Sequence, residues 1–294
     1  MGCKESLRGD TVLMDKLVIL RRRKLGMSSA KGIADVSKTG IRWVRNDQAN
    51  QPKEDEVVIR WGCTSNVVSK NVLNTAKAIH EVNNKGAFRS KCAEAKLSPA
   101  TWFNAADVPP YTLAKGVIVR PNSHAQGRHV YLCHTSADLD AAVRRCGVGY
   151  YISEYIRKTH EYRVYVVSGR AVAVAEKIPK DVNDVAWNHA LGGEFKNVRW
   201  DSWNLKCVRY AIEAMSLTDL DFGGVDVMCD DDNNVYIIEI NTAPSLTTPY
   251  RQSCFAKAFD YIAEHGKQTI PLVNKRGGYK KFIHPAINNE ALVL

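Results

Sequence analysis

No Cys-x-x-Cys pair occurs in the 294 residues, although the sequence contains eight cysteines. This absence leaves a structural zinc site or a thioredoxin-type redox motif without support. The cysteines are scattered, and several stand in apolar runs that are typical of small buried hydrophobic residues. A reducing cytoplasm is therefore the simplest setting for the protein.

Long apolar stretches are also absent. The sequence has no secretory signal peptide and no apolar run of about 18 residues, the length of a membrane-spanning helix. We therefore expect cytoplasmic localisation and no membrane partner.

The two commonest nucleotide-binding fingerprints are missing as well. Neither Gly-x-x-x-x-Gly-Lys-Ser/Thr nor Gly-x-Gly-x-x-Gly occurs, so P-loop and Rossmann folds lack their phosphate-binding loops. No RNP motif, zinc finger or clear helix-turn-helix supports a nucleic-acid-binding module.

Positive charge, in contrast, is abundant. The sequence has 41 Lys and Arg against 31 Asp and Glu, a formal net charge of +10. This excess favours an anionic partner such as a nucleotide, an acidic peptide or a nucleic acid. Basic residues cluster at 21–24 and 275–281, but such runs are more often solvated faces than binding sites.

Strand and helix patterns are mixed along the chain. Apolar, β-branched residues predict a buried strand at 57–61, and a glycine turn predicts a hairpin over 162–175. Helices are expected at 72–82 and at 138–146, the second with Ser136 as its cap. Several hairpins among helices indicate an α+β fold rather than one doubly wound sheet.

The segment 222–245 carries the most chemical information. Two apolar, β-branched stretches, 225–229 and 235–240, flank the polar turn 230–234 and predict a hairpin. Pairing about the middle of this turn places Asp226 roughly opposite Ile238, within one residue of Glu239.

Three oxygen-bearing side chains then converge: Asp226, Glu239 and Asn241, the last two sharing one face of their strand. Two carboxylates about 4 Å apart repel by roughly 4 kcal/mol at an effective dielectric near 20, so we expect a compensating cation. Hard oxygen ligands favour Mg²⁺, with Mn²⁺ as the alternative ion. A solvated surface hairpin is the other interpretation, and it explains the turn acids better than Glu239 and Asn241.

Further motifs precede this hairpin in a definite order. They are Arg120 at a strand end, Gly127 in the next loop, Glu154-Tyr155-Ile156, Glu161 with Arg163, Lys177, and Asn188 before paired glycines. Together with Glu239-Ile-Asn-Thr-Ala-Pro-Ser245 they resemble the ATP-grasp superfamily, and within it the RimK-like amino-acid ligases. The resemblance covers about residues 57–250.

The resemblance implies an ATP-grasp fold, in which two α+β subdomains clasp ATP behind a small α/β N-terminal domain. It divides the chain into an N-terminal domain at 1–75, a central subdomain with a phosphate lid at 76–150, and a C-terminal subdomain with the Mg²⁺ site and a basic tail at 151–294.

The implied activity is ADP-forming ligation of a carboxylate to an amine. The carboxylate attacks the γ-phosphate of ATP to give an acyl phosphate, and the amine then displaces the phosphate. Such chemistry depends on positioning and charge neutralisation, which basic side chains and Mg²⁺ supply.

The resemblance also assigns roles to residues. Catalysis falls to Arg163, Asn188 and Arg120, and the metal ion falls to the hairpin triad. ATP binding falls to Lys85, Arg120, Gln126, Gly127, Glu154, Tyr155, Ile156, Glu161 and Lys177. Glu161 and Arg163 could alternatively form a surface pair, and Lys177 a solvated strand end.

The sequence leaves the substrates open. The acceptor could be an amino acid, a peptide or a protein, and the basic surface would suit an acidic one. A nucleic-acid-modifying or nucleic-acid-binding protein on an ATP-grasp scaffold is the alternative, and a catalytically silent scaffold is the third interpretation.

Overall fold

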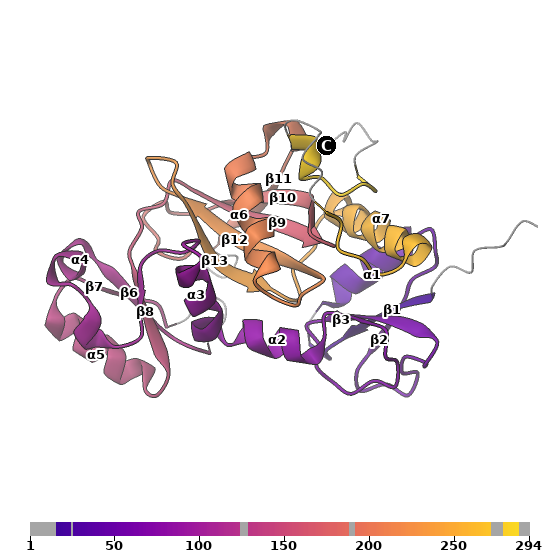
Figure 1. The fold of residues 1–294 in the computed structure, drawn as a ribbon, viewed down its shortest axis with the longest axis horizontal. Helices are drawn as coiled ribbons and strands as arrows, with labels where there is room; N and C mark the ends of the chain where they lie inside the picture. Colours follow the sequence, from indigo (N-terminus) through magenta and orange to yellow (C-terminus); the bar gives the residue numbers. More distant parts are fainter. Residues whose placement is uncertain (1–15, 25, 124–128, 188–191, 272–278, 288–294) are drawn as a thin grey trace, which may run out of the picture.

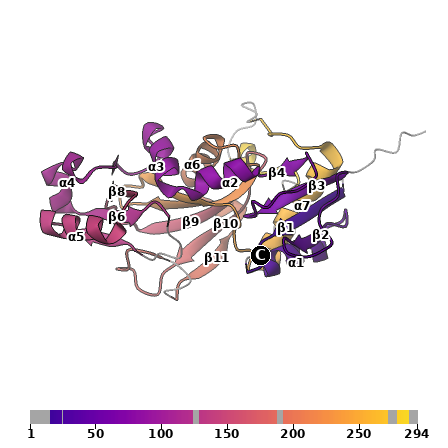
Figure 2. The same cartoon turned by 90° about the horizontal axis from the view of Figure 1, so that it is seen from below.

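The computed structural model describes residues 16–24, 26–123, 129–187, 192–271 and 279–287. These residues form three sheets that lie in a row (Figures 1 and 2). The central sheet lies within residues 101–154, the C-terminal sheet within residues 160–241 and the N-terminal sheet within residues 16–73, and the C-terminal sheet is the middle one of the row. In the described part of the chain, no helix is long and apolar enough to cross a membrane. The mixed helix and sheet architecture confirms the predicted α+β class.

The N-terminal sheet is parallel, in the order β2-β1-β3-β4. Its strands are β1 (Lys16–Arg21), β2 (Arg42–Arg45), β3 (Glu56–Trp61) and β4 (Val72–Leu73). β1 and β3 are buried along nearly their whole length, as parallel strands covered on both faces usually are. The helices α1 (Met27–Val36) and α7 (Pro249–His265) pack together beside this sheet (Figure 1).

The central sheet is antiparallel, in the order β5-β8-β6-β7. Its strands are β5 (Thr101–Trp102), β6 (Val117–Pro121), β7 (Tyr131–Cys133) and β8 (Tyr150–Glu154). The short turn η1 (Ala105–Asp107) and the helices α4 (Pro110–Lys115) and α5 (Ser136–Cys146) accompany it.

The cap of α5 differs from the prediction. Ser136 already lies in the first helical turn, and Thr135, whose backbone is extended, is the cap. Thr135 Oγ1 accepts from the backbone N–H of Asp138, and the Asp138 carboxylate accepts from the N–H of Thr135 at 3.2 Å. This reciprocal capping box satisfies two amide groups at the helix start, so the prediction of Ser136 is wrong by one residue.

The C-terminal sheet is antiparallel, in the order β11-β10-β9-β12-β13. Its strands are β9 (His160–Val167), β10 (Arg170–Ile178), β11 (Glu194–Val198), β12 (Phe222–Cys229) and β13 (Val235–Asn241). The predicted hairpins 162–175 and 225–240 are therefore confirmed. The short turns η3 (Trp200–Ser202) and η4 (Tyr279–Lys281) lie outside the sheet.

Side-chain alternation gives this sheet two different faces. Val225, Val227 and Cys229 point toward α6 (Leu205–Ser216), which covers one face. Phe222, Gly224 and Asp226 occupy the alternate positions of β12 and belong to the opposite face. That face is apolar at the Phe222 end and charged at the Asp226 end.

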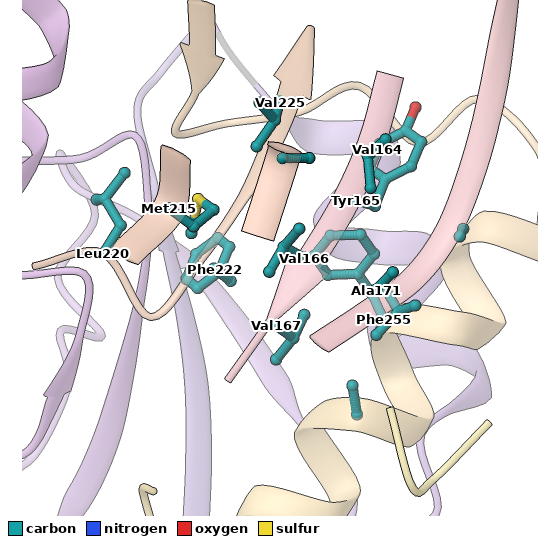
Figure 3. Packing of buried hydrophobic residues seen from close by; sticks show 14 of the residues in the cluster. Val164, Tyr165, Val166, Val167, Ala171, Met215, Leu220, Phe222, Val225 and Phe255 are labelled. Atoms are coloured by element: carbon teal, nitrogen blue, oxygen red, sulfur yellow. The ribbon is translucent and has the colours of Figure 1, made fainter. Parts of the chain in front are cut away.

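An aromatic cluster fills the apolar end. Figure 3 shows Phe222 and Phe255 among the apolar side chains of this core. Phe222 stacks on Trp61 with ring centroids 5.4 Å apart, and it meets Phe259 edge-on at 5.4 Å. Burial of each large apolar side chain contributes roughly 1.5–3 kcal/mol, so β3, α7 and β12 are firmly held together.

Two helices connect the N-terminal sheet to the rest, α2 (Ala76–Asn83) and α3 (Lys85–Glu94). The predicted helix over 72–82 is wrong in its first residues, because Val72–Leu73 is β4 and Asn74 has a positive φ of 62°. The buried Asn74 amide donates to Phe222 O at 2.9 Å and accepts from the Asp221 N–H at 2.7 Å. These bonds fix the end of β4 against the start of β12.

Candidate active site

The hairpin of β12 and β13 places its acids side by side. Asp226 is directly opposite Glu239 on β13 and opposite Arg163 on β9. The predicted pairing of Asp226 with Ile238 is wrong by one residue, because a bulge after Asp226 leaves Ile238 as an additional residue in β13. Asn241 is opposite Gly224, so all three members of the proposed triad share the charged face.

Basic and acidic side chains alternate across this face in a buried network. Arg163 Nε and Nη2 donate to the two carboxylate oxygens of Asp226 at 2.6 and 2.9 Å. Lys177 Nζ donates to Asp226 Oδ2 at 2.7 Å and also to Glu161 Oε1. Lys158 Nζ completes the chain at 2.5 Å from Glu161 Oε2.

The network changes the acidity of its members. Burial alone would raise the pKa of Asp226, but Arg163 and Lys177 outweigh it and hold that pKa well below its usual range. Burial opposes the charged form of Lys177, yet Asp226 and Glu161 raise its pKa. For Lys158, burial dominates over Glu161 and the pKa is lowered. Asp226, Lys177 and Arg163 therefore stay charged at neutral pH.

The three triad members are not equally open to a ligand. Asp226 is 2% exposed, and both of its oxygens already accept from Arg163 or Lys177. The Glu239 side chain is 25% exposed, and its ion pair is with Lys85 at 3.3 Å. Asn241 Nδ2 lies 3.4 Å from Asp226 Oδ2, which leaves the Asn241 Oδ1 without a donor among the described residues.

These oxygens fit a hard divalent ion. Carboxylate and amide oxygens suit Mg²⁺, which takes few protein ligands and keeps places for phosphate and water. The described residues contain no cluster of three or more His, Cys, Asp or Glu suited to a metal ion. The candidate therefore consists of Glu239 and Asn241, with Asp226 beside them already balanced by two cations.

A pocket adjoins the network, between the central sheet and the C-terminal sheet. Glu154, Tyr155 and Ile156 line one side, and Met228 and Ile238 line the other. The N–H of Tyr155 donates to Gly116 O at 3.0 Å, whereas the N–H of Ile156 has no acceptor in the described part of the chain. One backbone donor beside the pocket is therefore free among the described residues.

The remaining predicted residues fall in several places. Arg120 lines the pocket, and its buried Nε has no partner in the described structure. Lys85 begins α3 and contacts Glu239, while Glu161 and Lys177 lie inside the network, their charged groups occupied by each other. Gln126, Gly127 and Asn188 lie outside the described residues.

Two basic residues of the site were missed as pocket residues. Lys158 lines the pocket, contacts Glu161 and lies 4.7 Å over the Trp187 ring. Its position three residues before Glu161 is the signal that could have identified it. Arg89 also lines the pocket and donates to Ile237 O and Ile238 O, both at 2.8 Å, but nothing local in the sequence indicates that contact.

A buried arginine supports the loop that follows the triad. Arg251 is 1% exposed and donates to Thr248 Oγ1 at 3.0 Å, Thr247 Oγ1 at 3.1 Å and Tyr165 Oη at 3.0 Å. No described acid forms an ion pair with Arg251. Within the described residues its guanidinium therefore donates to neutral oxygens, one of them in the exposed loop residue Thr247.

Comparisons with known proteins identify the family of the chain. The RimK-like ATP-grasp domain family matches residues 95–262. No curated protein sequence matches the chain.

Solved structures share the fold at low sequence identity. The ATP-grasp ligase PsnB, complexed with a minimal precursor, is 12% identical with a TM-score of 0.60, over 85% of this chain and 99% of that one. The macrocyclase MdnC, bound to precursor peptide MdnA from Microcystis aeruginosa, is 14% identical with a TM-score of 0.57, over 84% and 99%. The D-alanine–D-alanine ligase of Bacillus anthracis, complexed with ATP, is 12% identical with a TM-score of 0.60, over 86% and 97%.

Proposed function

The chain belongs to the RimK-like ATP-grasp family, and we propose that it is an ADP-forming ligase that joins a carboxylate to an amine on a peptide. The family match and the ligase structures support ATP-dependent carboxylate–amine ligation in general. The acyl-phosphate route, the peptide acceptor and the individual roles below belong to the proposal.

The pocket would hold the adenine ring. The free N–H of Ile156 supplies a donor to a ring nitrogen, and Met228 and Ile238 supply apolar contacts from the opposite sheet. Arg120 and Lys158 bring positive charge to the same pocket. Nucleotide sites commonly combine apolar walls with a few directed polar groups in this way.

Glu239 and Asn241 would hold the Mg²⁺ ion, or Mn²⁺ as the alternative. When bound, such an ion would supply positive charge that offsets the charge of phosphate oxygens. Lys85, which faces Glu239, would neutralise phosphate charge beside it. Asp226 contributes mainly by fixing Arg163 and Lys177 through charged hydrogen bonds.

The observation that carries the proposal is the orientation of Arg163. Asp226 accepts from Nε and Nη2, while Nη1 has no acceptor among the described residues and the side chain remains 12% exposed. A guanidinium fixed on one edge presents its other edge in a defined direction. That edge would stabilise negative charge on the phosphoryl group during transfer to a carboxylate.

The loop 242–248 would meet the acceptor. Its exposed residue Thr247 accepts a hydrogen bond from the buried Arg251, which has no ion pair with a described acid. A substrate carboxylate bound beside Thr247 would offset the charge of Arg251. Gly62 lies against Ala243, where an added Cβ would come within 2.8 Å of the Ala243 Cβ, so the N-terminal domain borders the same loop. A peptide substrate agrees with the precursor peptides named in the PsnB and MdnC structures, and the net charge of +10 would suit an acidic one.

The test is ATP turnover on a peptide panel. The protein is incubated with ATP, Mg²⁺ and acidic or neutral peptides, and ADP and phosphate are measured with hydroxylamine present to trap an acyl phosphate. We expect ADP release that depends on peptide and a hydroxamate product. Peptide-independent ADP release without hydroxamate would remove the acyl-phosphate route, and Glu239→Gln serves as the inactive control.

The nucleic-acid alternative rests on net charge alone. Phosphate contacts release counterions, so such binding would weaken steeply with salt. Duplex DNA binding measured across a salt series separates the two functions, because a flat, weak signal leaves the peptide ligase as the remaining function.

A further inference from the structure

Two buried cysteines meet on the face of the C-terminal sheet that is remote from the charged network. Cys207 lies in the first turn of α6, and Cys229 is the last residue of β12. Their Sγ atoms are 3.1 Å apart, and the residues are 1% and 2% exposed. A disulfide requires about 2.05 Å, so the sulfurs need to approach by roughly 1 Å to become bonded.

The surroundings distinguish the two thiols. Asn204 Nδ2 lies 3.8 Å from Cys229 Sγ, and the Asn204 Oδ1 accepts from the Cys207 N–H at 3.2 Å. The hydrogen bond from Cys207 lowers the pKa of the Cys229 thiol and raises that of Cys207. Cys229, which also accepts from Asn204, is therefore the more acidic of the two thiols and the first candidate for oxidation.

We propose that Cys207 and Cys229 form a reversible disulfide that joins α6 to β12, with a hydroperoxide as the oxidant. The Cys229 thiolate attacks one peroxide oxygen and breaks the O–O bond, which gives a sulfenic acid and a hydroxide; this hydroxide takes up the proton that the Cys229 thiol released and becomes the first water. Cys207 then attacks that sulfur, and its proton and the displaced hydroxide leave as water. The two sulfurs lose two electrons in total, and hydrogen peroxide is reduced to two waters.

The pair differs from the other buried cysteines. Cys92 is equally buried at 1%, and burial raises its pKa to about 11. No second sulfur lies within hydrogen-bonding distance of Cys92 in the described structure. Proximity therefore singles out Cys207 and Cys229, and Cys92 offers a matched control.

The disulfide would stabilise β12, a strand of the proposed active site, on the face that α6 covers. β12 carries Asp226 three residues before Cys229, and the neighbouring Met228 lines the pocket. The backbone O of Cys229 accepts from the Thr159 N–H at 2.8 Å, which fixes the end of β12 beside the start of β9. A covalent link between residues 207 and 229 lowers the conformational entropy of the unfolded chain and so stabilises the folded state. We expect the melting temperature to rise by roughly 5 °C.

The experiment uses the full chain and needs no nucleotide. The protein is treated with hydrogen peroxide, its free thiols are alkylated after unfolding, and peptides are analysed by mass spectrometry with and without dithiothreitol. We expect a linked pair of peptides containing residues 207 and 229 that dithiothreitol separates, together with the rise in melting temperature. The Cys92→Ser variant retains both changes, whereas Cys207→Ser and Cys229→Ser each lose them.

Complete alkylation of residues 207 and 229 in the peroxide-treated wild type would overturn the proposal, and this result does not depend on whether any variant folds. An equal rise in melting temperature in Cys207→Ser would also overturn it. ATP turnover enters neither readout, so failure here is separate from failure of the proposed function.

Discussion

The two antiparallel sheets on either side of the pocket are stabilised in different ways. The C-terminal sheet has a large aromatic core at one end and a buried network of opposite charges at the other. The central sheet has a small apolar core, which includes Val117, Val119 and Ile152, and a helix fixed by a capping box. The C-terminal sheet thus depends on buried charges that neutralise one another, and the central sheet depends on local apolar packing.

Removal of one charge from the buried network should cause the largest decrease in the free energy of unfolding. Asp226→Asn leaves Arg163 and Lys177 buried beside a neutral amide, so the free energy of unfolding should fall by about 3–5 kcal/mol. Urea denaturation measures the change, with Lys31→Ala as a control at an exposed helix pair. A loss under about 1 kcal/mol would mean that the network contributes little to stability.

A cavity in the central sheet should act on that sheet alone. Ile152→Ala removes a fully buried side chain and should cost roughly 2–5 kcal/mol. Hydrogen exchange should accelerate in β6 and β8 but not in β9 and β12. Equal acceleration in all four strands would show that the two sheets unfold as one unit and would remove the distinction between them.

A buried histidine beside the C-terminal sheet should make the free energy of unfolding sensitive to acid. His284 is fully buried next to β10, and burial lowers its pKa to about 3. In the unfolded chain the His284 ring takes up a proton as the pH falls below 6.5, whereas in the folded protein the ring stays neutral until about pH 3. The free energy of unfolding therefore decreases as the pH falls from about 6.5 to about 3. The loss should reach about 2 kcal/mol at pH 5.

Denaturation of wild type and His284→Gln between pH 7 and pH 4 measures this effect. The variant should show a shallower decrease in the free energy of unfolding as pH falls. Parallel curves would assign the acid sensitivity to other groups.

The capping box should give the smallest effect. Thr135→Ala removes the side chain that accepts from the Asp138 N–H and should cost about 1 kcal/mol. Ser136→Ala, one residue later, is the matched control and should lower the free energy of unfolding by only a few tenths of the loss in Thr135→Ala. Comparable losses in both variants would contradict the assignment of Thr135 as the cap.

Local patterns in the sequence predicted the elements of the site but not their exact pairing. The acidic hairpin was found because its turn residues and β-branched strands lie within one short segment. The bulge at Ile238 has no signature in that pattern, so the register was one residue off. The predicted helix at 72–82 failed for a similar reason, because a single residue, Asn74, takes a left-handed conformation that tertiary hydrogen bonds select.

Contacts between distant residues could not be predicted without the fold. The bond between Lys177 and Asp226 spans 49 positions and requires β9 to lie between β10 and β12. The family resemblance, confirmed by the match over residues 95–262, predicted an ATP-grasp fold with two α+β subdomains but not this strand order. It did not indicate that Glu161 would be enclosed by Lys158 and Lys177.

Glu239 provides the most direct test of the account. Its side chain is the more exposed of the two acids, so Glu239→Gln should fold normally. Magnesium-dependent ATP binding is measured for both proteins by calorimetry with and without Mg²⁺. We expect the wild type to bind ATP more tightly with Mg²⁺ and the variant to lose that increment while retaining its metal-free affinity. An unchanged Mg²⁺ increment in the variant would contradict the proposed metal site and the mechanism that depends on it.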